Sequence, residues 1–139
     1  MPSRPLANLV KTGALKEERP SQSEFDGLLS SGRAVLKDAE IHSLSRQSRF
    51  ELSYSAAHSL ALAALRREGY RSENRYVVFQ SLVHTTNLSA AKARVLSDAH
   101  VKRNTIAYEG ALDITDSLVE SIIRVTKELL DYVEKLGPI

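Results

Sequence analysis

The sequence predicts an all-α protein, an antiparallel up-and-down bundle of four to five helices. Apolar residues recur every three or four positions in five successive segments, which is the period of an amphipathic helix. Short polar connections separate these segments, and the chain has no internal repeat. The run Tyr76-Val77-Val78-Phe79 is typical of a strand, but it has no partner strand elsewhere, so we expect a helix there as well.

The first 20 residues differ in composition from the rest of the chain. They hold three of the four prolines and the charged run Lys16-Glu17-Glu18-Arg19, and they leave room for only a brief helical turn around residues 6–10. We therefore predict a flexible N-terminal arm over residues 1–20 and one helical domain over residues 21–139. Ser21 and Glu24 have the spacing of a capping box, which predicts a first helix that reaches about Ala39.

The next three helices have clear end signals. The second helix is predicted to end at Gly69, a residue that favours C-terminal caps, and a shorter third helix is expected over residues 76–83. Ser89 is a suitable cap for a fourth helix, which reaches Tyr108 and is terminated by Gly110. The second helix has the most regular apolar face, in which alanines permit close approach of a neighbour; this face consists of Phe50, Tyr54, Ala57, Ala61, Ala64 and Leu65.

A fifth helix is predicted from about residue 116 to residue 136, with Thr115 or Asp113 as its cap. Ile123 and Leu130 widen its apolar face beyond what one packed neighbour can cover. A homodimer is the simplest way to bury the extra surface. The residues on its core face are Leu118, Ile122, Val125, Leu129, Val133 and Leu136.

The composition limits the classes of function. At 139 residues the chain has the length of one domain, and no apolar run approaches the roughly 20 residues that span a bilayer. It has no cysteine, no phosphate loop and no histidines at metal-ligand spacing, so we expect neither a metal nor a cofactor. The amino terminus lacks the pattern of a signal peptide, from which we expect a cytoplasmic location. The net charge of +2 permits contact with nucleic acid without requiring it.

One cation lies where the helical period predicts an apolar surface. On a helical projection of the fourth helix, Arg103 falls beside Leu96 and Ala99, inside the apolar stripe. A guanidinium cannot lose its proton at ordinary pH, so Arg103 needs solvent, a carboxylate or an anionic ligand such as a phosphate. Two interpretations stay open: Arg103 pairs with a nearby acid such as Asp98 or Glu109, or it binds an anion.

The order of several residues resembles that of HEPN-domain proteins, the higher eukaryote and prokaryote nucleotide-binding family. The resemblance covers about residues 22–136, and its most specific parts are a Gly-Tyr-Arg turn and an Arg-Asn motif. The residues that carry it are Arg49-Phe50, Tyr54, Ala57, Leu65, Gly69-Tyr70-Arg71, Lys102-Arg103-Asn104 and Tyr108.

The resemblance implies a bundle of four or five helices, usually dimeric, in which Arg-x4-6-His motifs of two subunits face each other across a cleft. Active members cut RNA without a metal. By position, Arg103 corresponds to the arginine that contacts the scissile phosphate, and Asn104 to the polar residue that helps to position the site. Tyr108 occupies the histidine position, and a phenol is a poor general base at neutral pH.

A different imidazole can replace the missing one. His100 lies three residues before Arg103 and four before Asn104, so all three share one side of the helix and can converge on one phosphate. The candidate catalytic residues are therefore His100, Arg103, Asn104 and Tyr108. We expect the other histidines to be ordinary solvated or core residues: His42, His58 and His84.

The leading hypothesis is a HEPN-like domain that binds RNA or a nucleotide at a dimer-interface cleft and can act as a metal-independent endoribonuclease. The family implies a toxin-antitoxin setting beside a nucleotidyltransferase partner in bacteria. The alternative is a catalytically degenerate helical interaction module, or the partner subunit of such a nucleotidyltransferase. A third interpretation is a helical bundle unrelated to the family.

Overall fold

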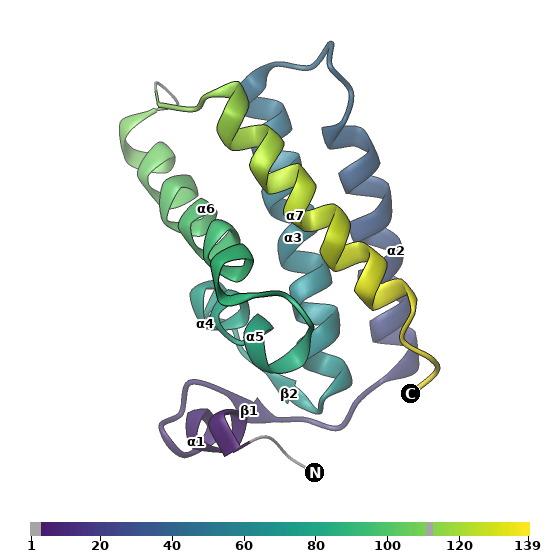
Figure 1. Cartoon of the computed structure of the whole chain (residues 1–139). Coiled ribbons are helices and arrows are strands. Elements are labelled where there is room, and N and C mark those ends of the chain that lie inside the picture. Colours follow the sequence, from purple (N-terminus) through teal and green to yellow (C-terminus); the bar gives the residue numbers. More distant parts are fainter. Residues whose placement is uncertain (1–3, 111–112) are drawn as a thin grey trace.

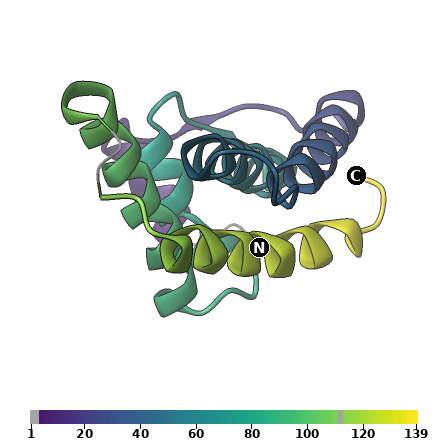
Figure 2. The same cartoon turned by 90° about the horizontal axis from the view of Figure 1, so that it is seen from above.

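A computed structural model describes residues 4–110 and 113–139 and confirms the all-α class. Its four long helices run alternately up and down the molecule (Figure 1). Helix α7 lies as a second layer across the pair formed by α2 and α3, with α6 at its side (Figure 2). The four long helices are α2 (Gln22–Ala39), α3 (Arg46–Arg67), α6 (Ala90–Glu109) and α7 (Asp116–Glu134).

The third predicted helix is present as two short pieces. Helix α4 (Arg75–Gln80) and helix α5 (Leu82–Thr85) meet at Ser81, whose hydroxyl donates a hydrogen bond to the carbonyl of Val77. This places the strand-like apolar run in a helix, as predicted. None of the helices in the described parts of the chain combines the length and the apolar character that crossing a membrane requires.

The residues predicted to cap and terminate the helices do so in the structure. The side-chain oxygens of Ser21, Ser89 and Thr115 each accept a hydrogen bond from the amide three residues further on, and so start α2, α6 and α7. Gly69 and Gly110 follow the ends of α3 and α6 with φ angles of +90° and +84°, a conformation that other residues rarely adopt.

Residues 4–20 are packed against the bundle, where we predicted a flexible arm over residues 1–20; residues 1–3 of that arm lie outside the described residues. They form α1 (Arg4–Lys11) and β1 (Lys16–Glu17), which pairs antiparallel with β2 (Tyr70–Arg71). Leu6 and Leu15 are buried in the core. The composition of this segment gave no sign of this packing, because the residues that hold it lie about 50 positions away, at the end of α3.

The wide apolar face of α7 is covered within the chain. Ile123 is only 4% exposed, and Leu130 is half-buried against the core. Helices α2, α3 and α6 all pack on α7, so three neighbours cover the face that one neighbour could not. Ile123 and Leu130 therefore need no second subunit to cover them, and the homodimer stays a prediction.

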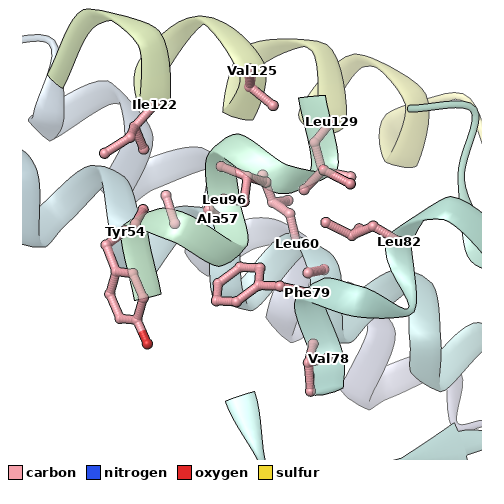
Figure 3. Close-up of a cluster of buried hydrophobic side chains, with 14 of the residues drawn as sticks. Tyr54, Ala57, Leu60, Val78, Phe79, Leu82, Leu96, Ile122, Val125 and Leu129 are labelled. Carbon is pink, nitrogen blue, oxygen red and sulfur yellow. The ribbon is translucent and has the colours of Figure 1, made fainter. Parts of the chain in front are cut away.

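Helix α3 is the centre of the molecule, and all six residues of its predicted apolar face are buried. Its side chains meet those of α4 and α6 on one side and of α7 on another, as in the cluster around Leu60 and Phe79 (Figure 3). The hydroxyl end of Tyr54 points away from this cluster (Figure 3). Tyr54 thereby connects the core to the surface near α4 and α6.

The close approach of α2 to α3 depends on Gly32. A Cβ atom at this position would lie 2.6 Å from Cγ of Leu60 and 2.7 Å from its Cδ2, and Leu60 is fully buried. We expect Gly32→Ala to lower the free energy of unfolding by about 1–3 kcal/mol, because the helices must separate or Leu60 must leave its rotamer.

Gly27→Ala is the matched control for Gly32→Ala, since Gly27 lies in the same helix and a Cβ there meets no atom within 4 Å. This change should be neutral or stabilise the protein by up to about 1 kcal/mol. Chemical denaturation of both variants measures the difference. Equal midpoints for the two variants would contradict the close packing of α2 on α3.

Candidate functional site

Arg103 lies in the apolar stripe of α6, as predicted, and it is half-buried. Its guanidinium carbon is 5.4 Å from the centre of the Tyr54 ring, in the position of a cation–π contact. Within the described residues it forms no ion pair with Asp98, Glu109 or any other carboxylate. The interpretation that Arg103 pairs with a nearby acid is therefore not supported, and the charge is available for an anion.

A second arginine reaches the same ring from another helix. Arg75 is the first residue of α4, and its guanidinium carbon is 5.9 Å from the Tyr54 ring centre. It too is half-buried and has no carboxylate partner among the described residues. Arg75 was not among the predicted site residues, because only the packing of α4 on α6 brings it to the same ring as Arg103.

His100 and Asn104 complete this side of α6. The Nδ1 atom of His100 is 2.8 Å from the Tyr54 hydroxyl, and Nε2 is 3.3 Å from the amide nitrogen of Asn104. In this arrangement the Asn104 amide donates to Nε2, so the ring proton lies on Nδ1 and is donated to the Tyr54 oxygen. Burial, and then the positive charges of Arg103 and Arg75, lower the pKa of His100, which favours the neutral ring at pH 7.

His58, which we expected to be ordinary, belongs to the same group of side chains. It lies one turn after Tyr54 on α3 and meets the Phe79 ring edge-on, with ring centres 5.9 Å apart. Burial lowers its pKa to about 4, with smaller contributions from the charges of Arg75, His100 and Arg103. The i, i+4 spacing from Tyr54 was the sequence signal that could have identified it.

Aromatic rings line the remainder of the site. Phe79 is buried below His100, with ring centres 6.1 Å apart, and Tyr76 is 39% exposed at 6.3 Å from His100. We call the whole group the Tyr54 cluster. It consists of Tyr54 and His58 from α3, Arg75, Tyr76 and Phe79 from α4, and His100, Arg103 and Asn104 from α6.

The structure does not bring Tyr108 into the Tyr54 cluster. Its side chain is 91% exposed on the last turn of α6. It lies one turn beyond Asn104 and about 140° around the helix from Arg103, which directs it away from Tyr54. Three of the four predicted site residues are therefore together, and the residue at the position of the family's histidine is not with them.

Arg71, which belongs to the HEPN resemblance, and Arg66, which does not, share structural partners. Arg71 donates to the carboxylates of Glu18 and Glu24, and Arg66 donates to Glu24 and to the carbonyls of Glu18, Arg19 and Tyr70. Burial alone would raise the pKa of Glu24, but the hydrogen bonds and charges of Arg66 and Arg71 together hold it below its usual value. The Glu24 carboxylate therefore accepts hydrogen bonds from Arg66 and Arg71. In the predicted capping box it would instead accept one from the backbone amide of Ser21.

Arg49, which opens α3, also has a structural role. Its side chain is buried and donates to the carbonyl of Ala39 and to the carboxylate of Glu120. It thereby connects the end of α2 to α7. The Arg49-Phe50 and Gly69-Tyr70-Arg71 parts of the resemblance accordingly describe how the bundle is held together, whereas Arg103-Asn104 lies at the surface site.

The chemistry of the Tyr54 cluster is that of an anion site. Two guanidinium groups can hold one or two phosphate oxygens each, and Tyr76 offers an exposed ring for stacking. Within residues 4–110 and 113–139, no three histidine, aspartate or glutamate side chains are placed to share a metal ion.

The fold and this site define a helical-bundle protein with a cationic, aromatic surface site. No family model, no curated protein and no solved structure matches this chain.

Proposed function

We propose that this protein is a HEPN-like helical domain that binds RNA, with Arg75 and Arg103 of the Tyr54 cluster holding the phosphate backbone. The observation that carries the proposal is the convergence of these two arginines on one aromatic ring without a carboxylate partner in the described residues. Two like charges that are half-buried together repel each other and are poorly hydrated. A bound phosphate would offset both the repulsion and the lost hydration. Two unpaired cations without such a ligand would not stabilise the fold.

The neighbouring side chains suit a nucleotide better than a simple anion. Tyr76 is exposed at the edge of the cluster, where a base can stack on its ring. The Asn104 amide, at the exposed end of the hydrogen-bonded chain that begins at Tyr54, can exchange its contact with His100 for a base or a 2′-hydroxyl. The proposed ligand is therefore RNA, or a nucleotide that carries the same groups.

His100 supports cleavage of the bound RNA as a second part of this proposal. A protonated imidazole beside a phosphate site can donate its proton to the leaving 5′-oxygen, while the attacking 2′-hydroxyl loses its proton to water and Arg103 stabilises the charge that develops on the phosphate. In the HEPN-like interpretation His100 replaces the histidine whose position Tyr108 occupies. This reaction needs no metal, and a second copy of the chain would bring a second Tyr54 cluster, as in the dimers of the family.

A different observation favours the alternative function, an interaction module. Tyr108 and Val101 are seven residues apart on one side of α6, and they are 91% and 53% exposed. Exposed aromatic and β-branched residues in one row are typical of a surface that binds another protein. Under this alternative a protein partner covers Tyr108 and Val101, for which the nucleotidyltransferase of the family is the first candidate, and Arg103 lies on the other side of α6, outside that contact.

The proposed function is tested with a labelled single-stranded RNA and the variant Arg103→Ala. We expect the variant to bind the RNA at least roughly tenfold more weakly, since a hydrogen-bonded charge contact is worth about 1.5–3 kcal/mol. Arg124→Ala is the matched control, because Arg124 is an exposed arginine of α7 outside the Tyr54 cluster. Fluorescence anisotropy measures binding, and gel electrophoresis of the same RNA measures cleavage.

Equal affinities for the wild-type protein and Arg103→Ala would contradict RNA binding at this site. Cleavage at background level in both proteins, with binding retained by the wild type, would remove only the ribonuclease part. Loss of RNA binding in Tyr108→Ala with no effect of Arg103→Ala would move the functional surface to the exposed row on α6.

A further inference from the structure

The two histidines of the Tyr54 cluster are close to cations from two helices, α4 and α6. His58 and His100 both contact the Phe79 ring, at ring-centre distances of 5.9 and 6.1 Å. The charged groups that act on them are Arg75 from α4 and Arg103 from α6, and His100 also acts on His58. Among the described residues, no carboxylate contributes to the field at either ring.

The hydrogen-bond partners of His100 can accommodate the doubly protonated ring. Tyr54 accepts from Nδ1, and the amide of Asn104 donates to Nε2. If the Asn104 amide turns by half a rotation, its oxygen faces Nε2 and accepts a proton there, with no movement of the backbone. The doubly protonated ring therefore fits the same surroundings, and the positive charge of the site is what opposes it.

We propose that the site binds its anionic ligand together with protons, which His58 and His100 take up when the ligand neutralises Arg75 and Arg103. This inference rests on the proposed function, because it needs an anion at the two guanidinium groups. A phosphate placed there brings negative charge to both rings and favours their protonated forms. Since binding and protonation favour each other equally, the affinity for RNA must rise as the pH falls.

The direction follows from the proton balance. In the free protein, the pKa of His58 is about 4 and that of His100 is below its ordinary value, so both rings are mainly neutral at pH 7. In the complex the anion raises both pKa values. The complex therefore holds more protons than the free protein, and its dissociation constant falls on acidification until the free histidines are themselves protonated.

The test uses oligouridylate with a 5′-hydroxyl end and a phosphodiester backbone. Neither uracil nor a phosphodiester changes its charge between about pH 5.5 and about pH 8, the range in which histidine titrates, so the pH dependence belongs to the protein. We expect the affinity of the wild-type protein to rise roughly tenfold or more across this range at constant salt, since each proton taken up contributes up to about tenfold per pH unit.

Variants assign the effect to the two rings. Whatever its affinity at pH 8, the double variant His58→Gln/His100→Gln should lose most of the increase in affinity at low pH. His42→Gln is the matched control, because His42 is an exposed histidine of the loop between α2 and α3, and it should keep the full increase. A nuclear magnetic resonance titration of the histidine C2 protons, with and without the oligonucleotide, should show both pKa values rising in the complex.

Each outcome has one meaning. Binding that is independent of pH, or a pH dependence retained in full by the double variant, overturns the proton coupling and leaves RNA binding intact. Absence of binding at every pH in that range, or equal binding by wild type and Arg103→Ala, overturns the proposed function and the coupling together.

Discussion

Arg66→Met is expected to lower the free energy of unfolding by about 3–5 kcal/mol, because it removes one partner from a buried ionic network. Arg66 is only 2% exposed and joins the end of α3 to the segment before α2. Methionine fills a similar volume, so the cost comes from polar groups and not from a cavity. The carbonyls of Glu18, Arg19 and Tyr70 lose a donor, and Glu24 keeps only Arg71.

Arg66→Met should destabilise the N-terminal segment at lower denaturant concentrations than those that unfold the whole protein. Since Arg66 binds the carbonyls of Glu18 and Arg19, its loss should release β1 from β2 and expose the amides of residues 4–20. Hydrogen exchange should therefore become faster in this segment at denaturant concentrations that leave α3 and α7 protected.

Arg67→Met is the control for Arg66→Met at the neighbouring position. Arg67 is half-buried, lies over the Phe25 ring at 5.7 Å and donates to the carbonyls of Gly137 and Pro138 near the chain end. We expect its loss to cost about 1 kcal/mol or less. Equal shifts of the denaturation midpoint in both variants would show that the network of Arg66 adds nothing beyond ordinary surface contacts.

The long helices could be predicted because their signals are local. Ser21, Ser89 and Thr115 need only the amide three residues ahead to start a helix, and Gly69 and Gly110 end helices through their own φ angles. Such signals are complete within a few residues, so the helix limits were correct to within a few positions.

The placement of residues 4–20 could not be predicted, because its cause is distant in the sequence. Leu6 and Leu15 are two isolated leucines in a proline-rich segment, and nothing local shows that they reach the core. Their position depends on Arg66, a residue that in the sequence is one of two adjacent arginines at a helix end. Only the structure shows that Arg66 points inward while Arg67 lies at the surface.

The same distinction applies to the Tyr54 cluster. Arg103 could be identified because the helical period places a charge among apolar residues of its own helix. His100 and Asn104 followed from their spacing to it. Arg75 and His58 belong to other helices, so their contribution depends on how α4 and α3 pack against α6. Helical periodicity thus located the α6 side of the site, whereas the contribution of α4 could be found only from the structure.

The double variant Arg75→Gln/Arg103→Gln should show the largest functional effect, a loss of RNA affinity of roughly 100-fold or more, because two charged contacts to phosphate are lost together. The slope of log affinity against log salt should become less steep by about two phosphate contacts. Glutamine keeps a hydrogen-bonding end group over the Tyr54 ring, so the change removes charge and leaves the packing nearly intact.

Binding and stability should change in opposite directions in this series. Arg75 and Arg103 are two like charges at 5.9 and 5.4 Å from the centre of one ring, so removal of either charge should raise the free energy of unfolding by roughly a few tenths of a kcal/mol while it weakens RNA binding. Charges that stabilised the fold through Tyr54 would instead make every variant less stable. A cycle of the two single variants and the double variant, measured by chemical denaturation and by anisotropy at two salt concentrations, separates these cases. Binding losses that are additive would indicate that the two arginines contact separate phosphates, and losses that are not additive would indicate that they share one phosphate.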